Sequence, residues 1–463
     1  MKQMDEAFLT ELDRLAGINN LRVLPEVRQN GKWIEKEGAR MLNLSSNDYL
    51  GLASDVSLKQ EFMSEIKEED FLFSSSSSRL LTGNFPVYTE LEQLLADTFG
   101  AESALVFGSG YHMNMGILPA VADGNTLILA DKLVHASLID GIRLSAARCI
   151  RYRHQDYTQV EQLLEKHHTE YSRIILVTES VFSMDGDVVP LARLVLLKKT
   201  YSNLMLYVDE AHGIGVRGQH GLGVAEEQGC LHDIDFLCGT FGKALASAGA
   251  YVVCRKVIRD YLVNKMRTLI FTTALPPLNM AWTRFIFSRL GEWTERRKHL
   301  DMISSRLREA VQSNGYECAS GSHIVPLTVG SSERAVWYAT ELQRKGFYVL
   351  PVRPPTVPEG TSRLRFSLTA AMTEEDINSL VQNIIPRTVP QGYDYLLCFD
   401  YRTLDFDEAY LEGYQEIYVM AWSMGVWVAG YVLSNASWPV IRSLAVNGTV
   451  YPIDDERGIP HAI

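Results

Sequence analysis

The sequence predicts an α/β protein that combines a large, doubly wound and mostly parallel sheet with a smaller α+β domain. Between about residues 70 and 275, strand-length apolar runs alternate with helical stretches, which is the pattern of a parallel sheet with helical crossovers. Several of these runs lack polar alternation, so we expect strands that are buried on both faces. From about residue 285 to 385, further helices and strands indicate the smaller domain.

Each element of this prediction follows from a local pattern. The first 20 residues form an amphipathic helix with Phe8, Leu9, Leu12 and Leu15 on one side. The large sheet takes its strands from ALVFGSG, NTLILAD, RIILVTES, NLMLYVDE, DFLCGT and GAYVVC. The smaller domain has helices at 281–290 and 300–313 and strands in SHIVPLTV, YVLPV and RLRFSL. We therefore expect four segments: an N-terminal helix and arm at 1–50, the large domain at 51–284, the small domain at 285–387, and a linker with a further segment at 388–463.

Composition narrows the classes of function. The 463 residues are 46% hydrophobic and 22% charged, as in a globular protein, and the net charge of −12 argues against nucleic acid or an anionic membrane as partner. The six cysteines form no C-x-x-C pair, which predicts neither a disulfide framework nor a zinc site. No run approaches the roughly 20 apolar residues that span a bilayer, and the charged start MKQMDEAFLTELDRL does not resemble a signal peptide. We expect a cytoplasmic protein.

Polar residues of the predicted large domain gather at the carboxyl ends of its strands. In a parallel sheet this edge is where ligands bind, so residues from separate strands are expected to converge on one site. Ser109 and Gly110 can open a helix whose free N–H groups favour a phosphate. The other candidates at strand ends are Tyr111, His135, Ser183, Asp209, His212, Thr240 and Lys243.

Lys243 is the only charged residue between Phe236 and Cys254, and small residues surround it. Taken alone, it could be a surface lysine, Asp209 could cap a helix, and a histidine could be structural. Together they suit pyridoxal phosphate (PLP), which needs an amine, an acid beside its ring nitrogen and an anion cradle. The carboxylate would keep the ring nitrogen protonated, because a nearby negative charge favours the cationic form.

Four motifs carry a family resemblance over about residues 5 to 385: TFGKALASAG, NDYLGL, FSMDGD and VDEAHGIGVRG. They resemble the signatures of the α-oxoamine synthases, a branch of the fold-type-I PLP transferases. That resemblance implies condensation of an amino acid with an acyl thioester and loss of carbon dioxide. RPPTVPEGTSRLRFSLTAA is similar to the branch that serves biotin synthesis. This implies L-alanine and a pimeloyl thioester, carried by coenzyme A or acyl carrier protein, as substrates.

The resemblance also implies roles for single residues. Lys243 would hold the cofactor and move the Cα proton, His135 would stack on the ring, and Asp209 would pair with the ring nitrogen. His212 and Ser183 would lie near the ring oxygen. The residues implied at the phosphate are Gly110 and Tyr111, through backbone N–H groups, and Thr240, through its hydroxyl.

Further roles concern the neighbouring subunit and the substrates. Thr272 or Thr273 would reach the phosphate of a partner subunit, which implies a homodimer. Arg365 would anchor the carboxylate of the amino acid, a task that suits a guanidinium, although a strand-surface arginine is the alternative. The remaining substrate contacts implied by the resemblance are Asn47, Thr356 and Arg22.

The last segment raises a separate question. In AWSMGVWVAG, Ser423 follows the apolar run EIYVM at a strand-to-helix turn, as in the nucleophile elbow of α/β-hydrolases. Residues 391–463 resemble the pimeloyl-carrier-protein methyl ester esterases. Half of the oxyanion hole and a convincing base are missing from this incomplete hydrolase-like segment, so we expect no competent esterase. A relic, a truncated chain, half of a split hydrolase and an ordinary serine all stay open.

Alternatives for the main function also stay open. Another PLP enzyme, such as a glycine-using acyltransferase resembling glycine C-acetyltransferase or an aminotransferase, would share most of these residues. A non-catalytic dimer partner would keep the fold, but it would not need Lys243. The run FLFSSSSSRLLTGN is either a spacer or an ordered loop that borders the site.

Overall fold

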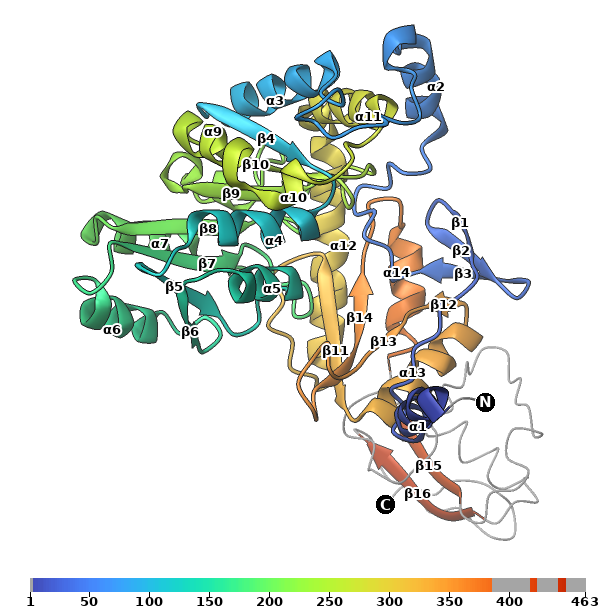
Figure 1. Cartoon of the computed structure of the whole chain (residues 1–463). Helices are drawn as coiled ribbons and strands as arrows, with labels where there is room; N and C mark the ends of the chain where they lie inside the picture. Colours follow the sequence, from blue (N-terminus) through green and yellow to red (C-terminus); the bar gives the residue numbers. More distant parts are fainter. Residues whose placement is uncertain (1–2, 385–416, 423–439, 447–463) are drawn as a thin grey trace, which may run out of the picture. The chain divides into compact units, whose positions relative to one another are not determined.

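The structure is a computed structural model, and it describes residues 3–384, 417–422 and 440–446 (Figure 1). The chain divides into two compact units, residues 1–384 and 385–463, which are described separately. The predicted boundaries of the four segments stay predictions.

A seven-stranded sheet forms the centre of the first unit (Figure 1). Its order is β4-β10-β9-β8-β7-β5-β6, and β10 alone runs antiparallel to its neighbours. The strands are β4 (Ser103–Phe107), β5 (Thr126–Asp131), β6 (Arg148–Tyr152), β7 (Arg173–Glu179), β8 (Leu204–Asp209), β9 (Phe236–Thr240) and β10 (Ala250–Cys254). The six predicted strands and the mostly parallel sheet are therefore confirmed. Strand β6 was not predicted, because its sequence, RCIRY, contains no apolar run. The strand lies at the edge of the sheet and is partly exposed.

Burial explains why these segments form strands. Every residue of β5 and of β10 is buried, as is every residue of β7 after its first. Continuous apolar runs of this kind fit strands that are covered by helices on both faces. Strand β10 turns back antiparallel to β9 just after Gly249, whose φ of 105° is a backbone conformation that glycine adopts easily and other residues do not. A Cβ at this position would lie 2.9 Å from the carbonyl oxygen of Phe107.

Helices connect and cover these strands. On one side α4 packs against α5 and α10, as Figure 1 shows, and elsewhere α3 packs against α11. Helix α4 begins where the Ser109 hydroxyl accepts the backbone N–H of His112, a common N-cap contact. The helices of this part are α2 (Val56–Glu65), α3 (Pro86–Phe99), α4 (Gly110–Val121), α5 (Ala136–Leu144), α6 (Tyr157–His167), α7 (Leu191–Thr200), α8 (Val224–Glu227), α9 (Lys256–Lys265), α10 (Arg267–Ile270) and α11 (Pro277–Ser288), with short 3₁₀ turns at Glu68–Asp70 and Leu231–Asp233.

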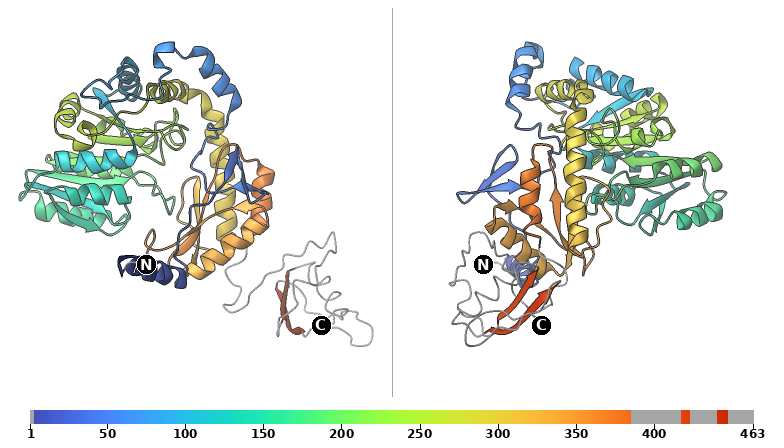
Figure 2. Two further views of the ribbon diagram at one scale, coloured as in Figure 1. Left: turned by 45° about the vertical axis from the view of Figure 1, so that its right-hand side comes forward. Right: turned by 180° about the vertical axis from the view of Figure 1, so that it is seen from behind.

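The rest of the first unit comes from both ends of its sequence. Strands β1, β2, β3 and β12 form one small sheet, and β11, β14 and β13 form another. Helix α12 runs between the large sheet and these small sheets (Figure 2). The elements are α1 (Gln3–Gly17), β1 (Arg28–Asn30), β2 (Trp33–Lys36), β3 (Ala39–Asn43), a 3₁₀ turn (Leu290–Trp293), α12 (Thr294–Ser313), β11 (Ile324–Gly330), α13 (Ser332–Arg344), β12 (Phe347–Tyr348), β13 (Pro351–Val352), β14 (Ser362–Ser367) and α14 (Glu374–Val381). The predicted N-terminal helix and the smaller α+β part are confirmed.

In the second unit the structure describes two strands, β15 (Ile417–Trp422) and β16 (Val440–Val446), which pair in parallel. Ser423 lies outside the described residues. Within the described part of the chain, no helix combines the length and apolar character needed to cross a membrane.

Candidate active site

Lys243 lies in the loop that joins β9 to the antiparallel strand β10. The backbone N–H of Phe241 donates to the carbonyl of Gly249 at 3.0 Å, which closes this loop at the carboxyl end of β9. Burial lowers the pKa of the Lys243 amine to about 8. The carboxylates of Asp209 and Glu179 oppose this shift, and the Arg365 guanidinium adds to it. An amine with such a pKa is neutral in an appreciable fraction of molecules near physiological pH, as a nucleophile must be.

His212 is the direct partner of this amine. Its Nε2 lies 2.7 Å from the Lys243 Nζ, and its Nδ1 lies 2.6 Å from the Tyr49 hydroxyl. The side chain is only 4% exposed, in the turn that follows β8. Burial, with the neighbouring charge of Lys243 as the next cause, holds the pKa of His212 well below its usual range. The imidazole is therefore neutral, and one of its two nitrogens has a free electron pair.

Asp209 ends β8 beside the carboxyl ends of β7 and β9. One carboxylate oxygen accepts the backbone N–H of Ala211 at 2.9 Å, and the other accepts the Asn114 amide at 2.8 Å. The Tyr207 hydroxyl donates in turn to the Asn114 oxygen at 2.6 Å. Asp209 is 6% exposed and Asn114 is 1% exposed. These contacts hold the carboxylate in one orientation at the edge of the sheet.

Glu179 lies next to Asp209, because the two residues are register partners in β7 and β8. Burial and the neighbouring Asp209 carboxylate raise the pKa of Glu179 to about 8. The backbone N–H of His135 donates to this carboxyl group at 2.7 Å. The His135 side chain caps α5, because its Nδ1 accepts the backbone N–H of Ser137 at 3.2 Å. The same Nδ1 also lies 2.8 Å from the Ser137 hydroxyl, while the residue itself stays exposed. An exposed imidazole fixed in this way can cover one face of a flat ligand.

An anion cradle lies at the start of α4. The backbone N–H groups of Gly110 and Tyr111 lie in its first turn, where they have no acceptor within the helix. A Cβ on Gly110 would lie 3.9 Å from the Thr240 side chain, so Thr240 borders this helix end. The Thr240 hydroxyl donates to the carbonyl of Gly249 at 3.0 Å, and the Tyr111 hydroxyl donates to Asp140. Tyr111 thus offers the cradle its backbone rather than its side chain.

These donors fit PLP. The aldehyde of the cofactor requires an amine, its pyridine nitrogen an acid, and its phosphate a set of N–H and hydroxyl donors. Lys243 supplies the amine, Asp209 the acid and the start of α4 the N–H donors. Strand register and neighbouring side chains place all three at the same edge of the sheet.

A second cluster forms around Arg365 on β14. Its guanidinium donates to the Asn47 side-chain oxygen at 3.3 Å from two nitrogens, to the Ser367 hydroxyl at 2.8 Å, and to the backbone carbonyl of Ser183. The structure therefore brings Asn47, Ser183 and Arg365 together. Ser183 takes part through its carbonyl.

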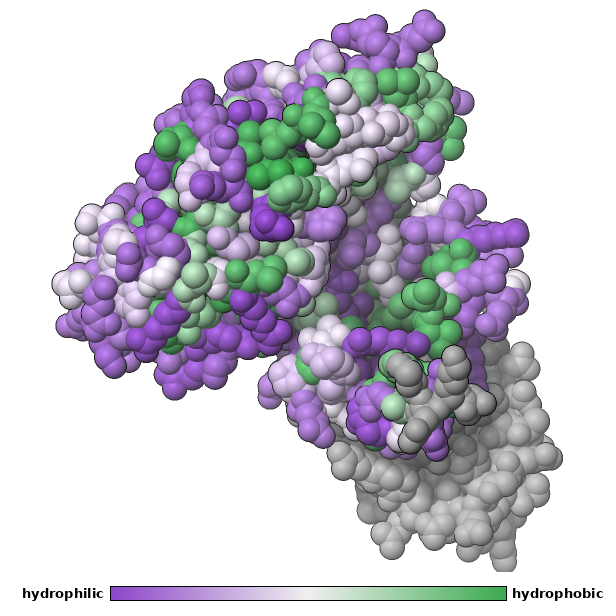
Figure 3. Space-filling view, viewed as in Figure 1, coloured by the Kyte–Doolittle hydropathy of each residue, from purple (hydrophilic) through white to green (hydrophobic). Residues whose placement is uncertain are grey.

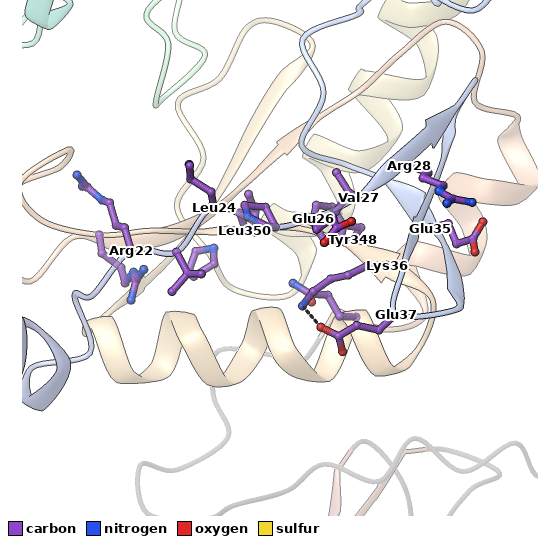
Figure 4. Close-up of a pocket in the computed structure, with 15 residues that line it drawn as sticks. Arg22, Leu24, Glu26, Val27, Arg28, Glu35, Lys36, Glu37, Tyr348 and Leu350 are labelled. Atoms are coloured by element: carbon purple, nitrogen blue, oxygen red, sulfur yellow. Dashed lines mark ion pairs between the residues drawn. The ribbon is translucent and has the colours of Figure 1, made fainter.

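Arg22 and Thr356 form a pair of their own. The Arg22 guanidinium donates to the Thr356 hydroxyl at 2.9 Å, although 334 residues separate them in the sequence. Both are exposed. Arg22 borders a pocket of ≈ 860 Å³ that also includes Leu24, Val27, Leu350 and Arg353 (Figure 4). Lys243, Asp209 and His212 are not among its lining residues.

Thr272 and Thr273 lie between α10 and α11. The Thr272 hydroxyl contacts the carbonyl of Thr273 at 3.5 Å, and Thr273 is exposed. The serine run packs against this segment, because the Ser75 hydroxyl donates to the carbonyl of Leu275 and the Ala274 N–H donates to the carbonyl of Ser77. Of the two alternatives for the serine run, the structure supports the ordered loop.

Four residues of the site escaped the sequence analysis: Glu179, Asn114, Tyr49 and His323. Asn114 lies one helical turn after Gly110, so the helical period could have placed it beside the cofactor edge. Tyr49 belongs to the NDYLGL motif, two residues beyond Asn47. His323 precedes β11 and packs edge-on against Tyr49, with 4.0 Å between ring centroids. No local pattern signals His323, because its neighbour in space lies far away in the sequence.

Comparison with known proteins identifies families and relatives that match this chain. Residues 39–384 match the family described as Aminotransferase class I and II, and residues 377–463 match Pimeloyl-ACP methyl esterase BioG. The chain is 57% identical over 381 residues to 8-amino-7-oxononanoate synthase of Haemophilus ducreyi, covering 81% of this chain and 98% of that protein.

Solved structures share the fold. A serine palmitoyltransferase variant of S. paucimobilis with bound PLP–myriocin aldimine superposes with a TM-score of 0.75 at 28% identity, covering 83% of this chain and 97% of that one. The 8-amino-7-oxononanoate synthase of Francisella tularensis superposes with a TM-score of 0.64 at 26% identity, covering 74% and 96%.

Fold and matches together define the class, a fold-type-I transferase that uses PLP. The chain belongs to the aminotransferase class I and II family and, within it, to the group of the 8-amino-7-oxononanoate synthases. The predicted fold class, cofactor and family are confirmed. The match of residues 377–463 also confirms the resemblance of the last segment to pimeloyl-carrier-protein methyl ester esterases.

Proposed function

We propose that the protein condenses L-alanine with a pimeloyl thioester to give 8-amino-7-oxononanoate, carbon dioxide and the free thiol of the acyl carrier. The observation that carries this proposal is the pairing of the Lys243 amine with His212 at 2.7 Å, in a chain 57% identical to an 8-amino-7-oxononanoate synthase. The product is a precursor of biotin, so the proposed place of the enzyme is biotin synthesis.

The cofactor contributes one property, since bound PLP supplies an electron sink for a carbanion at the Cα atom. Lys243 is the residue proposed to hold it covalently, and the amine, once displaced by the amino acid, moves the Cα proton. General-base steps of this kind contribute about 10²–10⁴-fold in rate. Asp209 is proposed to pair with the ring nitrogen and His135 to lie against the ring. The residues proposed for its oxygen and phosphate groups are His212, Ser183, Gly110, Tyr111 and Thr240.

The amino acid is proposed to bind through its carboxylate at Arg365, with Asn47 beside it. Support comes from the arrangement of the guanidinium, which is half-buried and directed by Asn47, Ser367 and the Ser183 carbonyl. A guanidinium can bind a carboxylate through two parallel hydrogen bonds. In a protein with a net charge of −12, a local cation is needed to attract an anionic substrate.

The acyl substrate is proposed to contact Arg22 and Thr356. Their mutual hydrogen bond and the adjoining pocket place an arginine beside exposed apolar side chains, including Leu24 and Leu350 (Figure 4). A pimeloyl chain has the same character, because it joins an apolar methylene chain to a terminal carboxylate. Coenzyme A and acyl carrier protein are both candidate carriers of this chain.

A homodimer is proposed, in which Thr272 or Thr273 reaches the phosphate of the partner subunit. Segments 71–81 and 271–278 are hydrogen-bonded to each other and expose several large apolar side chains, Phe71, Phe73, Leu80, Leu81 and Phe271. Figure 3 shows apolar residues gathered on the part of the surface near α10 and α11. Apolar patches of this kind mark interfaces more often than free surface.

Product identification by mass tests the proposal. The PLP-loaded protein is mixed with L-alanine and pimeloyl-coenzyme A or pimeloyl-acyl carrier protein, and Lys243→Ala is the control. Formation of 8-amino-7-oxononanoate by the wild type alone supports the function. Faster turnover of glycine or serine with other acyl thioesters would indicate a different α-oxoamine synthase, and a colourless protein that takes up no PLP would indicate a non-catalytic partner.

The match of residues 377–463 with Pimeloyl-ACP methyl esterase favours a second candidate function, ester hydrolysis at Ser423. Hydrolysis of a p-nitrophenyl ester by the wild type and by Ser423→Ala tests it. A rate that the substitution abolishes would establish this activity. Equal background rates would agree with the expectation that the segment is not a competent esterase.

A further inference from the structure

A continuous chain of hydrogen bonds joins the amine of Lys243 to the guanidinium of Arg365. Lys243 contacts His212 Nε2 at 2.7 Å, and His212 Nδ1 contacts the Tyr49 hydroxyl at 2.6 Å. The same hydroxyl contacts the Asn47 side-chain oxygen at 3.0 Å, and the Arg365 guanidinium contacts both Asn47, at 3.3 Å, and Tyr49, at 3.4 Å. The two proposed centres of reaction and substrate binding are thus connected through Tyr49.

In this series of hydrogen bonds, each group can donate in only one direction, and Arg365 determines which. A guanidinium only donates hydrogen bonds, so the Asn47 atom that faces it is the oxygen, which only accepts. The Tyr49 hydroxyl therefore gives its proton to Asn47. Its oxygen must then accept the N–H of His212 Nδ1, which leaves Nε2 with a free electron pair facing the Lys243 amine.

Burial makes this orientation costly to change. Tyr49 is 0% exposed, and the edge-on ring of His323 packs against it. Water has no access to replace the hydroxyl, so its removal would leave an imidazole N–H unpaired in the interior. The groups whose charges lower the pKa of His212 are Lys243, Arg365, His323 and His135, and none of these four has a carboxylate that could replace the hydroxyl as acceptor.

We propose that Tyr49 is a positioning residue, which holds His212 as the tautomer protonated on Nδ1 and thereby aims the Nε2 electron pair at Lys243. This inference rests on the proposed function and extends it, because it links the group that anchors the carboxylate to the group that moves the proton.

Removal of the Tyr49 hydroxyl, with the ring kept in place, tests this role. In Tyr49→Phe we expect kcat to fall about 10- to 100-fold, the range found when partners that orient metal-binding histidines are removed. We also expect the pH midpoint of the absorbance of the bound cofactor to move by about half a unit or more, since the environment of the amine changes. Tyr251→Phe is the matched control, because Tyr251 is also fully buried and its hydroxyl has no partner in the described part of the chain.

Equal behaviour of Tyr49→Phe and Tyr251→Phe in both kcat and absorbance midpoint would overturn the inference. A melting temperature for each variant shows that both are folded. A second measurement needs no variant of Tyr49: nitrogen-15 NMR of the histidine-labelled, cofactor-free protein, with the His212 signal identified by its loss in His212→Asn. The Nδ1–H tautomer supports the proposal, and the Nε2–H tautomer contradicts it. Since the tautomer is read without turnover, its failure is distinct from failure of the proposed reaction.

Discussion

The two halves of the candidate active site differ in charge and in origin. One half is acidic and comes from adjacent strands, with Asp209 on β8 and Glu179 on β7. The other half is basic because of Arg365 on β14, and it comes from distant segments. It also contains His323, before β11, but burial holds the pKa of His323 well below its usual range. Lys243 interacts with both halves: burial lowers the pKa of its amine, the carboxylates of Asp209 and Glu179 oppose this shift, and Arg365 adds to it. This difference fits the proposal that the site pairs with a cationic ring nitrogen on its acidic side and with an anionic substrate on its basic side.

Removal of the Lys243 amine affects the interactions of both halves of the site. Lys243→Met is expected to lower turnover by at least about 10³-fold, because the covalent anchor and the base are lost together.

The same variant is expected to stabilise the cofactor-free protein. The pKa of Lys243 is about 8 in the folded chain, against 10.5 for an ordinary lysine side chain in water, so the folded state carries the full cost of charging the amine below pH 8.

This cost falls as pH rises from 8 to 10.5, since there the folded state has released the proton and the unfolded state still binds it. The gain in melting temperature of Lys243→Met over wild type should therefore be larger at pH 7 than at pH 10. Thermal denaturation of both cofactor-free proteins measures this difference. A gain that increased with pH would show that the amine is not buried as described.

Loss of Arg365 removes the positive charge of the basic half and leaves the acidic half unchanged. Arg365→Ala is expected to raise the KM for L-alanine about 10- to 100-fold, since a hydrogen bond to a charged group is worth about 1.5–3 kcal/mol. Arg365→Lys should restore only part of this loss, because an ammonium cannot bind a carboxylate in bidentate fashion. Steady-state kinetics with saturating acyl thioester separates KM from kcat. An unchanged KM in Arg365→Ala would exclude the proposed carboxylate anchor.

A change at Asn114 tests the acidic half. Asn114→Leu removes the donor to Asp209 and the acceptor for Tyr207, both of them buried. An unpaired buried group costs about 1–3 kcal/mol, so PLP affinity is expected to fall about 10-fold. Tyr207→Phe leaves the contact of Asn114 with Asp209 in place and should have a smaller effect. Titration of each apoprotein with PLP, followed by absorbance, ranks the two variants, and equal affinities would contradict this role.

The sequence allowed prediction of one half better than the other, for a physical reason. Asp209, His212 and Lys243 follow buried strands, and the carboxyl ends of neighbouring parallel strands meet at one edge, so local patterns were enough to group them. Tyr49 and Arg365 touch although 316 residues separate them, and no local pattern brings such residues together. Arg365 and Asn47 were found only through the family resemblance, while His323 and Asn114 were missed.

Loss of His154, which contacts neither half directly, should have the smallest effect on turnover and a clear effect on stability. His154 bridges Asp131 at the end of β5 and Asp187 in the loop that carries Ser183, at 2.9 Å on each side. Burial acts to lower the pKa of His154, but the hydrogen bonds to both carboxylates outweigh it and raise the pKa to about 10. The same loop reaches the basic half through the ion pair of Asp185 with Arg363.

His154→Gln is expected to reduce the free energy of unfolding by about 2 kcal/mol, since it removes a charged partner from two buried carboxylates. The pKa is higher in the folded state than the usual 6.5, so the stabilisation is full below pH 6.5 and is lost as pH rises toward 10. Urea denaturation should therefore show a larger deficit for His154→Gln at pH 6 than at pH 9, whereas substitution of the exposed His232 by Gln should change neither value. A deficit that is the same at both pH values would mean that the charge of His154 does not contribute to the stability of this loop.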